Sequence, residues 1–495
     1  MVSSSILWCL ALLFLSNGVL TLTERDRSLE PTQKRPHLRQ LLPDTNRPAT
    51  TTLSTSTAGL VPYIIVMQQS ATREQIQDIN NKLLIEAAPG SLQTKTRKRT
   101  GLVVFFTAEI SSALANAIER LPGVGAVSPD LTPEEEQPPT PSAPLLIPRG
   151  RQLFGKGRSS SRDSDYLHLK SIRNPAEVCL QRQAETELKV ISQPPGAASA
   201  EDLPGFAYAA EAGKGVTIYV IDTGANIQNP EWRNMTGSKR FIYLPGVNQT
   251  ETDPDGHGSC IASKATGPEF EIAKGANIVM VKLKHNVCVV SYILVALVEI
   301  ENDVYDEGIQ GKAVVNISYS CFLYKNSSST IAYRLLLHTL IDEDIVIVTS
   351  SGNKRRFGFF RNKLSSYPAL FASSTDVIVV GAVEDDGSRS RYSQGTAKEL
   401  TTSAPGEVYC ASAETPTFTW DRGTSFASLP SGLAVPAVVG VIAVWLSQDI
   451  YAARLQVPGK VAANVKAMVK EFSYPRIENG PPAIWNGIDP RGLAT

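Results

Sequence analysis

The amino-acid sequence predicts an α/β protein with a doubly wound, mostly parallel sheet, preceded by a small split-βαβ (ferredoxin-like) domain. The chain has 495 residues, which is more than one ordinary domain holds and favours two folded units joined by linkers. In the second half of the chain, continuous runs of β-branched residues alternate with stretches of helical period. Nearer the N-terminus, shorter strands and helices form a pattern of their own, which indicates a separate domain.

The larger domain is predicted over residues 201–495. Its apolar runs are typical of strands that are buried on both faces of a parallel sheet. Predicted strands cover residues 215–221, 278–283, 313–318, 344–349 and 377–383, and predicted helices cover 291–306 and 330–342. Strands that alternate with helices in this way indicate a doubly wound sheet. Ligands of such sheets bind at the carboxyl ends of the strands, so we expect functional residues there.

The smaller domain is predicted over residues 61–130. Apolar runs predict strands, and apolar residues at helical spacing predict two helices between them. The strands cover 63–67, 101–107 and 125–128, and the helices cover 72–84 and 111–121. A further strand near 93–98 would complete the order β-α-β-β-α-β, which is the split βαβ motif. A unit of about 70 residues is small, but it can fold, particularly against a partner surface.

The remaining segments are predicted to be targeting or connecting sequence. Residues 1–20 resemble a signal peptide, because an apolar run at 6–15 is followed by polar residues. That run is too short to cross a bilayer. Residues 21–60 are rich in Arg, Pro, Ser and Thr and are predicted to be disordered. Residues 131–200 are Pro-rich and basic, which is typical of a linker or an N-terminal extension. We therefore expect a secreted, extracellular protein without a membrane anchor.

The charge balance argues against some classes of partner. Lys and Arg together number 48, and Asp and Glu also number 48. A net charge of zero gives no reason to expect nucleic acid as a partner. No glycine-rich phosphate loop follows the first predicted strand of the larger domain, which disfavours nucleotide binding. We expect a monomer.

Cysteines and glycosylation sequons fit a secreted chain. Five of the six cysteines follow the signal peptide, which allows up to two disulfides of undetermined pairing. Cys260 is expected to be a buried structural cysteine or one half of a disulfide. Four sequons are at Asn234, Asn248, Asn316 and Asn326. Because Asn316 lies inside a predicted buried strand, we do not expect a glycan there.

Four short polar motifs carry the residue types of nucleophilic catalysis. They are Asp222-Thr223-Gly224 after the first strand of the larger domain, Gly256-His257-Gly258-Ser259 at the start of a predicted helix, Ser351-Gly352-Asn353 after a later strand, and Gly423-Thr424-Ser425. A serine hydroxyl becomes a good nucleophile only when a neighbouring base takes its proton. A histidine can be that base, an aspartate can orient it, and an asparagine can donate to an oxyanion. Each motif alone also has an ordinary interpretation, as a cap, a surface histidine or a turn.

Taken together, in the chain order Asp, His, Asn, Ser, the motifs resemble those of the subtilisin-like (subtilase) serine peptidases, most closely secreted fungal members. The resemblance extends over about residues 215–447. It implies that the domain at 201–495 is a subtilisin-like catalytic domain that hydrolyses peptide bonds in proteins and peptides. The residues implied are Asp222, His257 and Ser425 as the catalytic residues and Asn353 as the oxyanion donor.

The same resemblance has implications for binding. It implies that residues 61–130 are a propeptide that inhibits its own enzyme intramolecularly, so that the chain is made as a zymogen. It also implies that a substrate backbone adds as a strand beside the cleft. The residues implied there are Ser318, Tyr319, Ser320, Ser351 and Gly352, and Ser320 stands where the family usually has glycine. Family members often bind calcium, so calcium is left open, but the sequence names no metal ligand and no other cofactor is expected.

One segment departs from the family pattern. Without residues 429–435, the run after the predicted nucleophile would match the family without a gap. Pro430 and Gly432 disfavour a helix interior. Either the helix restarts near Pro436 and Ser425 lies on a loop, or the segment is an error in the predicted transcript. If the segment is real, a second hypothesis is a catalytically impaired, secreted binding protein with the subtilase fold.

Overall fold

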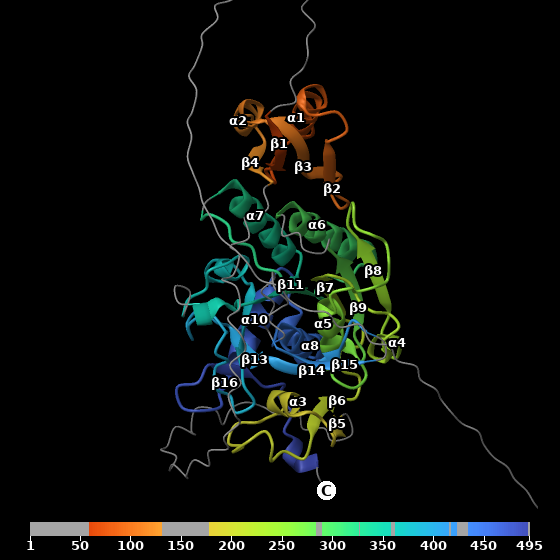
Figure 1. Cartoon of the computed structure of the whole chain (residues 1–495), viewed down its shortest axis with the longest axis vertical. Coiled ribbons are helices and arrows are strands. Elements are labelled where there is room, and N and C mark those ends of the chain that lie inside the picture. Colours follow the sequence, from red (N-terminus) through yellow and green to blue (C-terminus); the bar gives the residue numbers. More distant parts are fainter. Residues whose placement is uncertain are drawn as a thin grey trace, which may run out of the picture. The chain divides into compact units, whose positions relative to one another are not determined.

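The structure is a computed structural model (Figure 1) that describes residues 59–130, 178–283, 290–325, 327–357, 362–414, 417–422 and 434–493. Several predictions from the sequence lie outside these residues. They are the signal peptide at 1–20, nearly all of the segment at 21–60, most of the linker at 131–200, the sequon at Asn326, the nucleophile Ser425 and most of the segment at 429–435.

A seven-stranded sheet organises the larger domain, with the strand order β13-β12-β11-β10-β7-β9-β8. All of its neighbouring strands are parallel. The strands are β7 Thr217–Asp222, β8 Lys239–Tyr243, β9 Asn277–Lys282, β10 Ala313–Ile317, β11 Ile345–Ser350, β12 Ile378–Val383 and β13 Thr402–Pro405. Every residue of β7, β10, β11 and β12 is buried, which explains their continuous apolar sequence. The predicted doubly wound parallel sheet is confirmed.

Helices cover both faces of this sheet. Successive side chains of a strand point to opposite faces, and β7 illustrates this alternation. Ile218 and Val220 pack in the core that contains α5 His257–Thr266, α8 Ala434–Ser447 and α10 Val461–Glu471. Tyr219 and Ile221 pack in the core that contains α6 Val290–Glu307 and α7 Ser328–Asp342. The sheet is therefore the middle layer of three.

Residues 59–130 form a four-stranded antiparallel sheet with the order β2-β3-β1-β4. Its elements are β1 Leu60–Met67, α1 Arg73–Glu86, β2 Gln93–Arg97, β3 Leu102–Ser111, α2 Ser112–Glu119 and β4 Val124–Pro129, in the order expected from the sequence. Both faces of β1 are covered, since Ile65 packs under α1 and α2 whereas Ile64 and Val66 join the core of α6 and α7. This sheet thus shares a core with the larger domain.

Residues 178–200, which the sequence assigned to the linker, fold with the larger domain. β5 Val178–Gln181 pairs with β6 Phe206–Ala209, and α3 Thr186–Ile191 places Leu188 in the main core. These elements are too short to show a clear apolar period.

The other elements are α4 Pro230–Arg233, β14 Glu407–Ala411, β15 Phe418–Arg422, α9 Asp449–Leu455, β16 Ser473–Pro475, β17 Pro482–Ile484 and the 3-10 turns Lys354–Phe357, Ala369–Ser373 and Pro490–Leu493. Among the helices that the structure describes, none alone is long and apolar enough to cross a membrane. α8 and α9 meet that criterion only as a pair bent by 98°, and the apolar side chains of α8 are buried in the core.

Candidate active site

An aspartate and a histidine meet at the carboxyl edge of the central sheet. Asp222 is the last residue of β7, and His257 is the first residue of α5. His257 Nδ1 lies 2.8 Å from Asp222 Oδ1, and the backbone N–H of Thr223 donates to the same oxygen at 2.8 Å. Because Asp222 is fully buried, its carboxylate holds the imidazole in one orientation. This leaves Nε2 as the nitrogen available to a reacting group.

The glycines around His257 permit this close approach. Gly256 caps α5 in the left-handed region at φ +85°, and a Cβ there would come within 2.9 Å of the backbone nitrogen of Ala413. At Gly258, a Cβ would collide with the carbonyl oxygen of Gly224. α5 can therefore begin against the β7 loop only with glycine on both sides of the histidine.

Three carboxylates set the charge state of His257. Burial of the imidazole opposes protonation, but the negative charges of Asp222, Asp253 and Asp421 outweigh it and raise the pKa of His257 to about 9. The surrounding structure therefore stabilises an imidazolium more strongly than water does. His257 Nε2 is itself buried and has no hydrogen-bond partner within the described part of the chain.

Asp253 is a member of this site that the sequence did not single out. Its carboxylate is buried and accepts hydrogen bonds from the Ser259 N–H and hydroxyl, both at 2.7 Å, and from the Thr223 hydroxyl at 2.8 Å. It thereby joins the loop after β7 to the first turn of α5. The available signal was an aspartate in the same short loop as the histidine motif, four residues before His257.

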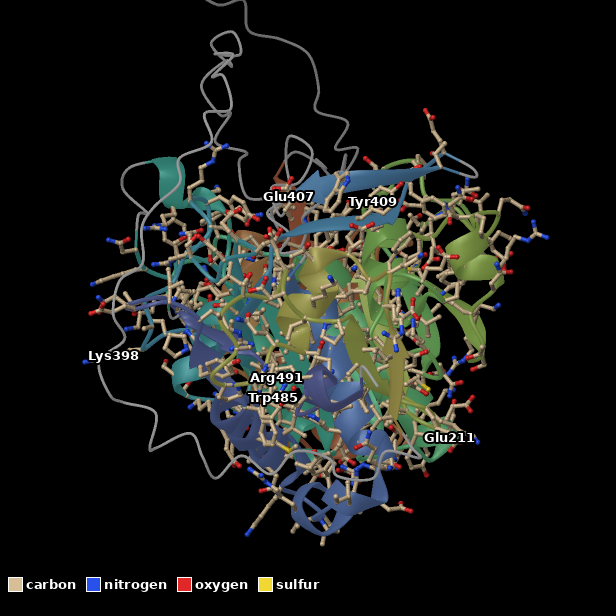
Figure 2. All side chains as sticks on the ribbon, turned by 90° about the horizontal axis from the view of Figure 1, so that it is seen from below. Glu211, Lys398, Glu407, Tyr409, Trp485 and Arg491 are labelled. Atoms are coloured by element: carbon tan, nitrogen blue, oxygen red, sulfur yellow. A yellow bond between two sulfur atoms is a disulfide. The ribbon has the colours of Figure 1, made fainter. Side chains whose placement is uncertain are left out.

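A hairpin of β14 and β15 is fastened to α5. A disulfide joins Cys260 of α5 to Cys410 of β14, so Cys260 is half of a disulfide. Beside it, the Ala411 N–H donates to the Ser263 hydroxyl at 3.1 Å. The ring of Tyr409 (Figure 2) packs against rings of β15. β15 ends three residues before Ser425 in the sequence, so the chain reaches the predicted nucleophile from an element that is tied to the histidine helix.

The loop of Asn353 lies at the same edge of the sheet. β7, β10 and β11 are neighbours, and Ile221, Ile317 and Thr349 lie in register across them. The loop that follows β11 therefore leaves the sheet two strands away from Asp222, at a distance of about 10 Å. Asn353 is buried in that loop.

Gln394, which the sequence did not predict as a site residue, fixes this loop. Its backbone N–H donates to the Gly352 carbonyl at 3.0 Å, and its side-chain oxygen accepts from the backbone N–H of Lys354 at 3.1 Å. Gly352 has φ +93°, and a Cβ there would lie 2.5 Å from the Gln394 side chain. The chain can make this turn only with glycine at this position.

The predicted substrate-binding segment follows β10. The side chains of Ser318, Tyr319 and Ser320 are all buried, and the Asn316 amide donates to the Ser318 hydroxyl at 2.7 Å. Asn316 is itself fully buried in β10, as its position within an apolar run predicted.

Two buried glutamates of the larger domain lie beside a lysine. Among the described residues, no three Asp, Glu, His or Cys side chains gather as a metal-binding group. Glu231 and Glu271 are buried in one region, and burial raises their pKa values to about 7 and about 8. Lys274 Nζ lies 2.6 Å from Glu271 Oε1 and also donates to the Pro268 carbonyl. An ammonium thus supplies the cation, which does not fit Ca²⁺ with its six to eight oxygen ligands.

A parallel sheet with a buried Asp–His pair at its carboxyl edge, and an asparagine loop two strands away, defines a subtilisin-like α/β fold. Residues 213–452 match the model of the subtilase family, peptidase S8. Residues 213–452 are therefore a subtilase-family domain.

Similar proteins fit that assignment. Subtilisin-like protease 2 of Trichophyton rubrum is 28% identical over 295 residues, which cover 58% of this chain and 63% of that protein. The protein of the same name in Trichophyton equinum is 28% identical over 293 residues, with the same coverage. The match thus spans less than two thirds of the length of these relatives. The structure of the epidermin leader peptide processing serine protease of Staphylococcus aureus has a TM-score of 0.53 at 14% identity, covering 87% of this chain and 98% of that one, and this likeness supports the fold.

Proposed function

We propose that this protein is a secreted serine endopeptidase that is made as a zymogen. The observation that carries the proposal is the 2.8 Å contact between His257 Nδ1 and the buried Asp222 carboxylate. It leaves Nε2 as the base for a serine nucleophile. The names of the fungal relatives support a peptidase, and the predicted signal peptide supports secretion.

The proposed mechanism follows from these roles. Ser425 Oγ attacks the carbonyl carbon of the scissile peptide bond while His257 Nε2 takes its proton. Asp222 stabilises the imidazolium that forms, and the Asn353 amide donates to the oxyanion. His257 then gives the proton to the leaving amine, which breaks the C–N bond and leaves an acyl ester on Ser425. Water, deprotonated by His257, hydrolyses this ester and restores the free serine.

The zymogen proposal rests on how residues 59–130 contact the larger domain. The face of β1 that carries Ile64 and Val66 joins the core of α6 and α7. At the end of this unit, Asp130 accepts a hydrogen bond from the Ser291 N–H in the first turn of α6 at 3.2 Å. Burial raises the pKa of this carboxyl. A unit packed in this way is suited to act as an inhibitory propeptide.

Labelling by a fluorophosphonate, followed by N-terminal sequencing of the secreted protein, tests the proposal. We expect Ser425→Ala to abolish both labelling and self-processing. Ser428→Ala, which removes a hydroxyl three residues further on, is the matched control and should retain both. Absence of labelling in correctly folded wild-type protein would instead support the binding-protein hypothesis, which the segment at 429–435 motivates.

A further inference from the structure

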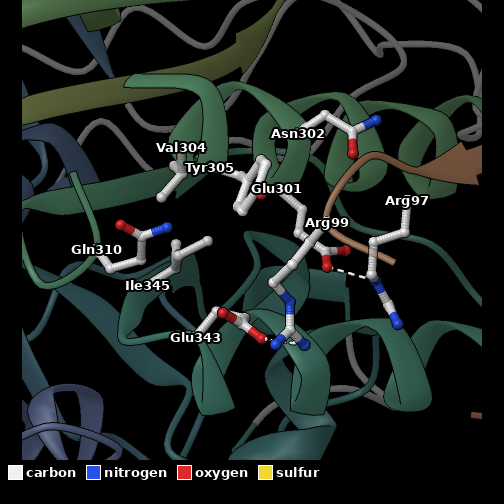
Figure 3. Close-up of a pocket in the computed structure, with 9 residues that line it drawn as sticks. All are labelled: Arg97, Arg99, Glu301, Asn302, Val304, Tyr305, Gln310, Glu343 and Ile345. Atoms are coloured by element: carbon white, nitrogen blue, oxygen red, sulfur yellow. Dashed lines mark ion pairs between the residues drawn. The ribbon is translucent and has the colours of Figure 1, made fainter. Parts of the chain in front are cut away.

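A basic segment of the small domain lies against an acidic strip of the larger one. The strip consists of Glu299, Glu301, Asn302 and Asp306 of α6 together with Glu343 at the end of α7. Four ion pairs join it to β2 and the turn that follows. They are Lys95–Glu299 at 3.0 Å, Arg97–Glu301, Lys98–Asp306 and Arg99–Glu343 at 2.5 Å. Figure 3 shows the two arginines and their carboxylate partners around one small pocket. Each cation thus has its own carboxylate.

Asn302 forms hydrogen bonds with the main chain of the same basic segment. Its side-chain oxygen accepts from the Lys98 N–H at 2.7 Å, and its amide donates to the Thr96 carbonyl at 3.1 Å. Asn302 is 6% exposed, so these bonds are shielded from water. The two contacts join the end of β2 and the first residue of the turn that follows it, so they fix the register of this segment against α6. The strip therefore recognises both a backbone conformation and a spacing of charges.

The four ion pairs differ in how far they are shielded from water and salt. The side chains of Arg97 and Glu301 are 13% and 5% exposed, and burial raises the pKa of Glu301 although Arg97 opposes this. Removing either partner would leave a buried charge without compensation. The side chains of Lys98 and Asp306 are 57% and 45% exposed, so that pair is readily screened by salt. Arg97 is thus the anchor of the segment, and the outer cations set the register.

Neighbouring acidic residues of α6 serve the larger domain instead. Asp303 pairs with Arg240 of β8 at 2.5 Å and accepts from the Tyr219 hydroxyl. The carboxylates of the strip, in contrast, form their ion pairs with residues 95–99 in the part of the chain that the structure describes. Without that segment, the strip would hold several carboxylates near one another with no cation between them. Such an arrangement favours binding of a basic segment.

We propose that this acidic strip is a docking site for a basic segment with the spacing Lys-x-Arg-Lys-Arg, made of a strand end and the turn that follows it, whose occupant is residues 95–99 of the same chain. The apolar contact of β1 with α6 and α7 supplies buried area. The charged contact fixes which segment docks and in which register. In the context of the proposed zymogen, which this inference deepens, the strip holds the propeptide in place in a manner that depends on ionic strength.

Hydrogen–deuterium exchange of the full-length chain tests the docking site without any need for catalysis. A Ser425→Ala background prevents self-processing, so a lack of peptidase activity would not affect the result. We expect Glu299→Gln with Glu301→Gln to speed exchange of β2 roughly tenfold at about 0.1 M salt. At about 1 M salt, where the Debye length falls to about 3 Å, exchange in the protein with an unsubstituted strip should speed up only in part, because salt screens the exposed pairs and not the buried Arg97–Glu301 pair.

A charge swap and a matched control separate docking from general destabilisation. Lys95→Glu alone should speed exchange of β2, and adding Glu299→Lys should restore protection, which a merely destabilised domain would not show. Glu86→Gln, which removes the exposed Lys82–Glu86 pair within α1, should leave exchange of β2 unchanged. Exchange that is independent of salt and equal in all of these variants would overturn the proposal, because the apolar contact alone would then hold the domain.

Discussion

Removing the disulfide between α5 and β14 should destabilise the larger domain strongly. Cys260 and Cys410 are 150 residues apart in the sequence, and both are buried. Replacing both with alanine frees this long loop in the unfolded chain. It also leaves the hydrogen bond from the Ala411 N–H to the Ser263 hydroxyl as a local contact between the two elements. The native hairpin therefore keeps part of its attachment while the unfolded state gains entropy.

The magnitude follows from the length of the loop. A cross-link that closes about 15 residues is worth about 3 kcal/mol in the chain-entropy model, and one that closes about 100 residues is worth about 4.7 kcal/mol. The same logarithmic relation gives about 5 kcal/mol for the separation between Cys260 and Cys410. Measured losses for native disulfides are about 2–5 kcal/mol, so we expect a loss in the upper part of that range.

Urea unfolding in a Ser425→Ala background measures this loss without autolysis. The cysteine double variant should unfold at a lower midpoint than the Ser425→Ala protein. The Ser425→Ala protein with both cysteines, measured in reductant, should unfold at the same midpoint as the double variant. Cys179→Ala and Cys321→Ala alter cysteines outside the disulfide and are the matched controls. If the double variant unfolded at the midpoint of these controls, the disulfide would not constrain the unfolded chain and the reasoning would be refuted.

Three further predictions concern activity. His257 must be neutral to act as a base, and its pKa is raised to about 9, so kcat/KM should rise with pH through that region. Asp253→Asn should move the midpoint of the pH–rate profile to lower pH, because it removes one of the charges that raise the pKa of His257. An unmoved midpoint would contradict this role of Asp253. Asn353→Ala should lower kcat by about 10²–10³ with little change in KM, because it removes an oxyanion donor, and an equal loss confined to KM would assign Asn353 to substrate binding instead. Gly258→Ala should abolish activity and lower the unfolding midpoint, because its Cβ would collide with the Gly224 carbonyl; normal activity of this variant would show that α5 can move away from β7.

The central sheet was predictable because burial on both faces leaves a direct trace in the sequence. Each residue of β7 is buried, so its apolar run predicts a buried strand even when the neighbouring strands are not known. Residues 178–200 gave no such trace. α3 buries Glu187, whose carboxylate accepts from Lys264 of α5 at 3.1 Å and from the Tyr409 N–H of β14 at 3.2 Å. A charged residue in a short helix indicates exposure unless its distant partner is known.

The parts of the candidate site that could be predicted are residues at the ends of helices and strands that the sequence itself predicts. Asp222 ends a strand and His257 begins a helix, and parallel topology brings such ends to one edge. The disulfide was not predictable, since its partners are 150 residues apart and several pairings were open. Asp253 was missed for a similar reason, because its role depends on three hydrogen bonds that form only when two loops meet.

The charge on His257 links the disulfide to the chemistry. One of the three carboxylates that raise the pKa of His257, Asp421, belongs to β15 rather than to the loops next to the histidine. Its position relative to the imidazole depends on the hairpin, and the hairpin is fastened to α5 through Cys410. His257 has a folded-state pKa above its ordinary value of about 6.5, so its contribution to stability is complete below that pH and is lost as the pH rises through about 9. The proposed general base acts only when it is neutral. The pH range that favours activity is therefore the one in which the imidazolium no longer stabilises the fold. In that range, attachments such as the disulfide have to hold α5 and the hairpin together.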